Sequence, residues 1–300
     1  MTALVQQKYL RPYSATYGWR LTPAGYAWLS EQGFPMQVDR HTQRVNRRFE
    51  NAAVILTMYA ADIDPFADSL AALREKGGYL SASVLRGREG QHPIGISLVS
   101  GFLRLGGTMF AVHYPQTAQR VIIQREIDCA QSAMLGSSCT EQAYLLCGSS
   151  YTDIYRALLE EQTSCTGKRV SYARFYQQIS PAYLLPCNKD GVLQLRLMQV
   201  ANYRPRLAKM LGAPITEPHL SDCDFFSADF QFPARIVADM ELRQVFRAAQ
   251  QARAAGYHGL LLAAFESQKR FLTQIFPPPF FHVAVIDEQA LCILEMGADL

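Results

Sequence analysis

The chain has 300 residues, of which 49% are hydrophobic and 18% are charged. This composition excludes a disordered chain and predicts an ordered protein that is long enough for two domains. The seven cysteines form no C-x-x-C pair and no Cys/His cluster with zinc-ligand spacing. We therefore expect neither a bound metal nor a cofactor.

The N-terminal residues lack the basic-then-apolar pattern of a secretory signal. No apolar run approaches the roughly 18 residues that a membrane helix needs. Scattered cysteines among apolar residues are typical of a reducing compartment. We expect a cytoplasmic protein without a membrane partner.

The net charge of +3 is distributed unevenly along the chain. Residues 1–50 hold seven Lys/Arg and three Asp/Glu, a net charge of +4, whereas the other 250 residues hold 22 basic and 23 acidic side chains, a net charge of −1. Electrostatic attraction to phosphate groups is therefore expected from the N-terminal segment alone.

Residues 8–33 predict a strand, a tight turn, a second strand and a helix. In the second strand Tyr17, Trp19 and Leu21 alternate with polar or small residues, which is the period of a half-buried strand. Thr22 is a suitable N-cap, Pro23 suits the first helical position, and Gly33 is the expected C-cap.

A long basic helix is predicted over residues 39–63, followed by a short helix within 65–78. Apolar residues recur in the long helix at spacings of three and four, which indicates one buried face. Its first half holds four arginines that share a helical face, Arg40, Arg44, Arg47 and Arg48.

From residue 79 onward the pattern predicts an α/β sheet covered by helices. Strands are expected at 79–87, 95–107, 108–115, 120–124, 142–148, 182–186, 192–200, 228–239, 259–265 and 280–291. Helices are expected at 125–135, 150–162, 202–212, 240–256 and 266–276, and no internal repeat is visible. We expect two domains: 1–75, with the wing strands and the basic helix, and 76–300, an α/β domain with a mixed sheet.

The segment YGWRLTPAGYAWL (17–29), the arginine-bearing helix and the strand-rich region after Lys76-Gly77-Gly78 resemble the replication–relaxation family of plasmids and conjugative elements. The resemblance is firmest over about the first 115 residues. It implies a winged helix joined to a nuclease-like α/β domain, with a role in handling DNA during replication or transfer.

The chain departs from this pattern at its start, because TALVQQKYL leaves too little room for the helices that precede the wing. A winged helix reads bases mainly with its recognition helix. We therefore interpret residues 1–75 as a truncated or degenerate remnant of a winged helix.

The nuclease chemistry is also expected to be absent. A PD-(D/E)xK nuclease needs an acid near one strand start and acid-x-Lys on the next strand to hold Mg²⁺. The best placement is Asp190 before the expected strand 192–200, where Gln194-Leu195-Arg196 fills the second motif. Glu126, Asp128 and Asp239 are further acids near the expected sheet, and Asp222 and Asp224 are expected to be solvated turn residues. We expect the α/β domain to be a non-catalytic scaffold.

The sequence thus favours a DNA-binding accessory protein that contacts the phosphate backbone of duplex DNA. The expected contacts are the cations of the N-terminal segment, Lys8, Arg11, Arg20, Arg40, Arg44, Arg47 and Arg48. The tyrosines and tryptophans of the wing either contact DNA as well or form the small core behind the strands. A relaxase or replication protein and a homodimer are further partners to consider. The alternative function is a protein–protein scaffold, in which the apolar strand after Pro277-Pro278-Pro279 is a pairing edge.

Overall fold

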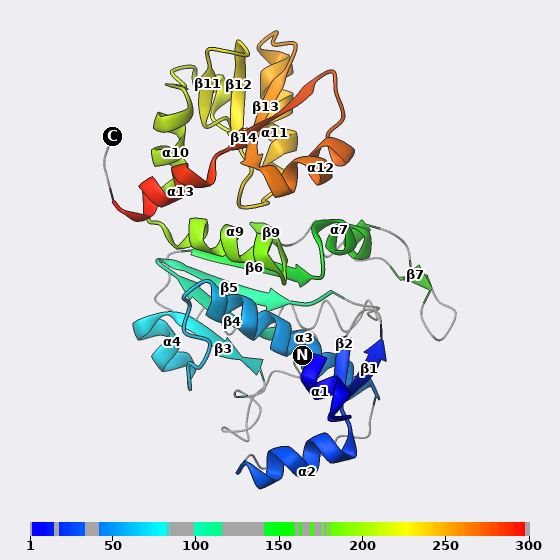
Figure 1. Cartoon of the computed structure of the whole chain (residues 1–300). Helices are drawn as coiled ribbons and strands as arrows, with labels where there is room; N and C mark the ends of the chain where they lie inside the picture. Colours follow the sequence, from blue (N-terminus) through cyan, green and yellow to red (C-terminus); the bar gives the residue numbers. More distant parts are fainter. Residues whose placement is uncertain are drawn as a thin grey trace. The chain divides into compact units, whose positions relative to one another are not determined.

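The computed structural model describes residues 2–14, 18–33, 42–82, 84, 99–115, 141–159, 162–163, 169–170, 176, 179 and 181–297 (Figure 1). By their contacts the residues group into two units, Met1–Ala52 and Ala53–Leu300. This division falls inside one helix, whereas the sequence suggested a boundary after residue 75. Each unit is described separately below.

The first unit contains the two predicted strands and the helix that follows them. Its elements are α1 (Thr2–Gln6), β1 (Leu10–Ser14), β2 (Gly18–Leu21), α2 (Pro23–Glu31) and the start of α3 (Thr42–Ala60). The two strands pair antiparallel. Thr22 caps α2 as expected, and the C-cap is Gln32, directly before Gly33 with its φ of 85°.

The second unit contains two five-stranded mixed sheets, so the predicted α/β fold class is confirmed. Sheet 1 has the order β3-β4-β5-β6-β9. Its strands are β3 (Gly78–Ser81), β4 (Val99–Leu105), β5 (Thr108–His113), β6 (Glu141–Gly148) and β9 (Ala182–Pro186). Its helices are α4 (Leu70–Lys76), α7 (Tyr151–Leu159) and α9 (Lys189–Gln199), and a small hairpin joins β7 (Gln162–Thr163) to β8 (Arg169–Val170).

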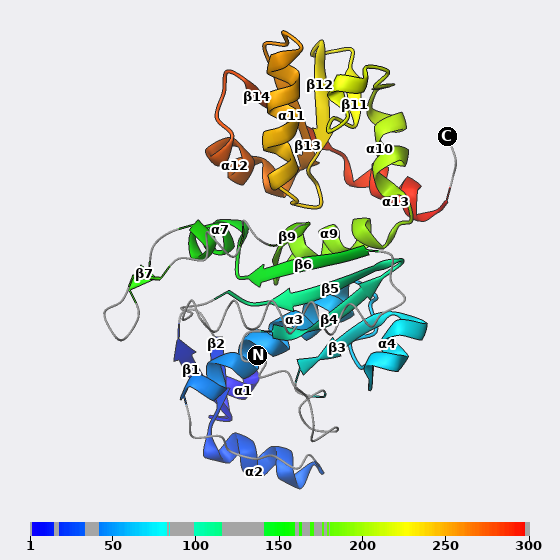
Figure 2. The same cartoon turned by 180° about the vertical axis from the view of Figure 1, so that it is seen from behind.

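Sheet 2 has the order β10-β11-β12-β13-β14. Its strands are β10 (Ala213–Pro214), β11 (Phe225–Ser227), β12 (Phe232–Ile236), β13 (Leu260–Phe265) and β14 (Phe281–Ile286). The helices are α10 (Tyr203–Leu211), η1 (Pro218–Leu220), α11 (Arg243–Ala254), α12 (Glu266–Ile275) and α13 (Glu288–Glu295). Figure 2 shows α11 lying across one face of this sheet.

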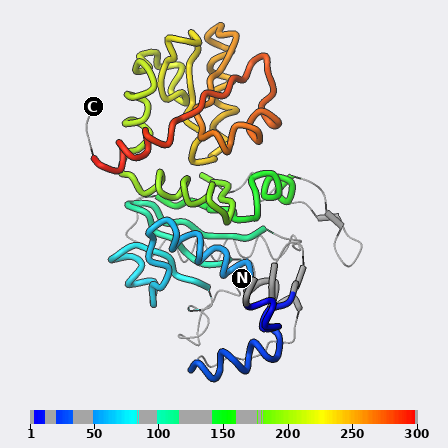
Figure 3. The backbone as a smooth tube through the Cα atoms, in the orientation of Figure 1, coloured from blue at the N-terminus to red at the C-terminus, as the bar shows by residue number. Residues whose placement is uncertain are grey.

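The two sheets repeat one topology. In each, the first three strands are antiparallel neighbours, and the last two are added in parallel. A helix precedes each sheet, another lies between its last two strands, and a third follows it. We call Leu70–Gln199 the first repeat and Tyr203–Glu295 the second. This repeat was not visible in the sequence, where only the hydrophobic periods are shared. Figure 3 traces the backbone from one repeat into the other.

Alternate side chains of each central strand enter different cores, because both faces of the sheets are covered. In β13, Leu260 and Leu262 belong to a cluster that also takes in one face of sheet 1. Leu261 of the same strand belongs to a second cluster, on the opposite face of sheet 2. In sheet 1, Tyr79 and Leu145 belong to a third cluster.

The prediction of a strand at 192–200 is wrong, because these residues form helix α9. The Asn188 side chain accepts hydrogen bonds from the backbone N–H groups of Asp190 (2.9 Å) and Gly191 (3.4 Å) and so caps the helix. The apolar alternation misled because α9 is covered on two sides. Leu195 packs in the cluster of sheet 1 and Leu197 in that of sheet 2.

Other boundaries also differ from the sequence prediction. The short helix begins at Leu70 rather than near Pro65, β3 ends at Ser81, and β12 covers only part of 228–239. The segment 280–291 splits at Asp287, whose side chain caps α13. The predicted strand 120–124 and helix 125–135 lie outside the described residues, as do Glu126 and Asp128.

Candidate functional site

The β1–β2 hairpin brings two of the predicted DNA-binding positions together. Arg11 and Arg20 are direct Cα partners in the antiparallel register. Directly paired positions share a face of a two-stranded sheet, and like charges at such positions destabilise the pair unless an anion lies close by. Arg11 is exposed, which places one cation of this pair in solvent.

Helix α2 packs closely behind this hairpin. The Thr22 side chain accepts from the Gly25 N–H (3.1 Å) and donates to the Lys8 carbonyl (2.5 Å). A Cβ atom at residue 25 would lie 2.3 Å from the Tyr9 carbonyl oxygen, so the approach of helix and strand requires glycine. The Tyr9 ring stacks on Trp28 with 5.3 Å between ring centroids. For Tyr9, the alternative of a small core behind the wing is therefore favoured.

The remaining predicted cations are only partly placed. Lys8 is exposed and has a left-handed φ of 59° in the turn that enters β1. Helix α3 includes Arg44, Arg47 and Arg48, but only their backbone is described. The side chains of these three residues, and all of Arg40, lie outside the described part of the structure. The structure therefore pairs Arg11 with Arg20 and leaves the shared face of the four helical arginines as a prediction.

Asp190, the acid that the sequence suggested for a nuclease-like motif, does not stand before a strand. Asp190 lies in the first turn of α9, so it precedes no strand. In the part of the chain that the structure describes, Asp224 lies one residue before β11. The next strand, β12, holds Pro233-Ala234-Arg235, with proline at the acid position and arginine at the lysine position. A second carboxylate is therefore missing from this pair of strands.

Asp224 belongs to a network of charges that the sequence did not predict. Its carboxylate contacts the guanidinium groups of Arg204 (3.3 Å) and Arg235 (3.4 Å) and accepts from the Ile236 N–H (2.7 Å). Burial raises the pKa of the Asp224 carboxyl more than the two guanidinium groups lower it. The expectation that Asp224 is a solvated turn acid is wrong, because these contacts hold its side chain 13% exposed.

Asp239, three residues after the end of β12, completes the network. It is fully buried and forms an ion pair with Arg204 (2.5 Å), and the Tyr203 hydroxyl donates to the same carboxylate oxygen. Burial works against the charge of Arg204, but the carboxylates of Asp239 and Asp224 hold its pKa above its usual range. The carboxylates of Asp224 and Asp239 are therefore both engaged in ion pairs with arginine. In the described residues no three His, Cys, Asp or Glu side chains converge to hold a metal ion.

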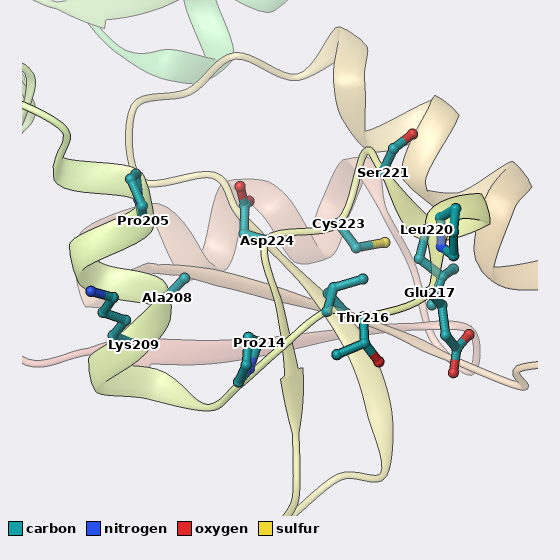
Figure 4. A pocket seen from close by; sticks show the side chains of 12 residues that line it. Pro205, Ala208, Lys209, Pro214, Thr216, Glu217, Leu220, Ser221, Cys223 and Asp224 are labelled. Carbon is teal, nitrogen blue, oxygen red and sulfur yellow. The ribbon is translucent and has the colours of Figure 1, made fainter.

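A pocket of about 520 Å³ lies beside this network (Figure 4). Helix α10 forms one side with Pro205, Ala208 and Lys209, and the segment from 214 to 224 forms the rest. Cys223 lines the pocket, but burial raises the pKa of its thiol to about 12, so it is protonated near neutral pH and is a poor nucleophile. The lining suits an apolar group and offers no activated nucleophile among these residues.

None of the helices that the structure describes combines the length and apolarity needed to cross a lipid bilayer. The comparisons with known proteins add no relative: no protein-family model, no curated protein and no solved structure matches the chain.

Proposed function

We propose that the protein is a DNA-binding accessory protein and that its first unit contacts the phosphate backbone of duplex DNA. The cations assigned to the contact are Lys8, Arg11, Arg20, Arg40, Arg44, Arg47 and Arg48. The resemblance to the replication–relaxation family implies that the protein acts during the replication or transfer of a plasmid or conjugative element. A relaxase or replication protein is the expected protein partner.

The observation that supports the proposal best is the pairing of Arg11 with Arg20 across the hairpin. Like charges at directly paired positions repel each other, and a bound phosphate offsets such repulsion. The net charge of +4 in residues 1–50 likewise favours contact with phosphate groups. Binding of this kind carries little sequence information, because phosphate contacts position a protein on DNA without reading bases.

The test is fluorescence anisotropy with a labelled 20-base-pair duplex at several salt concentrations. Replacing Arg40, Arg44, Arg47 and Arg48 by alanine is expected to weaken binding about tenfold or more and to flatten its salt dependence, because each lost phosphate contact removes one counterion-release step.

The matched control removes four exposed cations from the second unit, Arg247, Arg253, Lys269 and Arg270. Both variants lose four positive charges, so a general effect of net charge weakens both equally. Absence of binding at low salt, or an equal loss in the two variants, refutes the proposal.

A second candidate function, a protein–protein scaffold without DNA binding, is supported by strand β14. It is the last strand of sheet 2, and its sequence FHVAVI carries no Lys, Arg, Asp or Glu that would discourage pairing with another strand. Val285 in this strand is 42% exposed. Light scattering after size-exclusion chromatography separates the two functions: a monomer that binds DNA favours the first, and a dimer that ignores DNA favours the second.

A further inference from the structure

Two cysteines that are forty residues apart in the sequence lie on the same face of sheet 1. Cys147 ends the apolar part of β6, and Cys187 directly follows β9. In the parallel register Cys147 is the Cα partner of Leu185, and Gly148 is the partner of Pro186. Because alternate residues of a strand share a face, Cys187 lies on the same side as Leu185 and Cys147.

The chain turns toward β6 at this point, which brings the two thiols together. The Cys187 N–H donates to the Gly148 carbonyl at 2.7 Å, so residue 187 is drawn toward the end of β6. Burial first, and then the neighbouring Cys187 thiol, raise the pKa of Cys147 well above its usual range. Both side chains pack in the hydrophobic cluster that contains Tyr79.

The two thiols differ in access to solvent, which gives them different chemical roles. Cys147 is completely buried, whereas Cys187 is partly exposed. A soluble oxidant therefore reaches Cys187 first and finds the thiol of Cys147 already beside it. Neither of the other two free cysteines in the described residues is partly exposed, because Cys223 is buried and Cys292 is exposed in α13.

We propose that Cys147 and Cys187 are a redox site that forms a reversible intramolecular disulfide with hydrogen peroxide as the oxidant. The sulfur of Cys187 attacks one peroxide oxygen, the O–O bond breaks, and sulfenic acid and water form. Burial keeps the Cys147 thiol protonated, so its proton passes to the departing hydroxyl as its sulfur attacks the sulfur of Cys187; the S–O bond breaks and a second water leaves. Two thiols are thereby oxidised and one peroxide is reduced to two waters.

A disulfide here joins the end of β6 to the residue just before the N-cap of α9. The N-cap residue, Asn188, also donates to the Ser149 carbonyl at 3.2 Å, so the bridge reinforces a contact that already exists. Oxidation is therefore expected to stabilise the first repeat rather than to unfold it.

The experiment treats the reduced full-length protein with hydrogen peroxide in slight excess, blocks free thiols, and digests with trypsin and a glutamate-specific protease. This digestion yields Gln142–Arg156 and Phe175–Lys189, each with one cysteine, so a linked peptide identifies the pair unambiguously. We expect both thiols to be lost together and the link to disappear with a dithiol reductant, while Cys223 stays free.

Two variants test the order of the steps. Cys147→Ala is expected to stop at a sulfenic acid on Cys187, which dimedone traps, and Cys187→Ser is expected to leave Cys147 unreacted. Cys292 is the matched control, because it is exposed but has no thiol partner in the described residues. A sulfinic acid on Cys187 without any linked peptide, or a link from Cys187 to another cysteine, overturns the proposal.

Discussion

A relay of two glutamines and a tyrosine joins the two repeats, and it offers the sharpest test of the fold. Gln194 of α9 is completely buried and donates to the carbonyl oxygens of Leu184 (2.9 Å) and Asp239 (2.6 Å). It accepts from the Tyr151 hydroxyl at 3.0 Å. That hydroxyl also accepts from Gln268 of α12 at 3.1 Å. The relay therefore crosses from one sheet to the other without leaving its amide groups unpaired.

Gln194→Leu removes three of these hydrogen bonds and keeps the volume of the side chain. At about 1 kcal/mol for each net hydrogen bond, the free energy of unfolding is expected to fall by about 3 kcal/mol. The loss comes from partners left buried without a hydrogen bond rather than from a cavity. Urea unfolding followed by circular dichroism measures it through the shift of the midpoint at constant slope.

The matched control is Gln274→Leu, at an exposed position of α12, where a change within about 0.5 kcal/mol is expected. Tyr151→Phe removes one hydrogen bond that Gln194→Leu also removes. The double variant is therefore expected to lose about 1 kcal/mol less than the sum of the single losses. A loss below about 1 kcal/mol for Gln194→Leu, or full additivity with Tyr151→Phe, refutes the relay as a structural link.

Three further predictions follow from local geometry. Gly25→Ala places a methyl group against the Tyr9 carbonyl and is expected to destabilise the first unit by about 1–3 kcal/mol. Both tryptophans of the chain lie in this unit, at positions 19 and 28, so thermal unfolding followed by tryptophan fluorescence measures this loss. An unchanged melting temperature contradicts the prediction. Burial raises the pKa of the Glu241 carboxyl, so the folded state holds this proton more tightly than the unfolded state. The associated stability is lost as pH rises above the ordinary pKa of about 4.5. Glu241→Gln is therefore expected to be more stable than the parent protein at neutral pH but not at pH 3, and equal stabilities of the two proteins at both pH values would show that burial does not perturb this group. No cleavage of single- or double-stranded DNA is expected with Mg²⁺ or Mn²⁺, because Asp224 lacks a second carboxylate on β12; metal-dependent nicking that disappears in Asp224→Asn contradicts this.

The sequence predicted best those elements that have one buried face and a local end signal. Helix α2 follows from the cap Thr22 and from Pro23, and helix α11 follows from its apolar stripe. The fold class was predictable for the same reason, since each hydrophobic period is a local property of the chain. The strands β6, β9 and β13 are short apolar runs bounded by turns, and they were found where expected.

The errors arose where the environment of a residue is set by distant parts of the chain. Helix α9 looked like a strand because it is buried on two sides, which its own sequence does not reveal. The ion pairs of Asp224 depend on Arg204 and Arg235, which reach it from other elements. No local signal pointed to this network, because the strand expected nearest to Asp224 began at residue 228 and β11 was not predicted. The contact between Cys147 and Cys187 likewise depends on the pairing of two strands.

The position of α9 also limits how this protein can be divided into fragments for study. The helix closes the first repeat in the chain order, yet Leu193, Leu197 and Val200 pack in the core of the second. A fragment that ends at residue 200 would expose these three apolar side chains to water and would tend to aggregate. Isolating the first repeat for spectroscopy therefore requires polar residues at these three positions, whereas a fragment that begins at α10 would need a substitute for the helix it has lost.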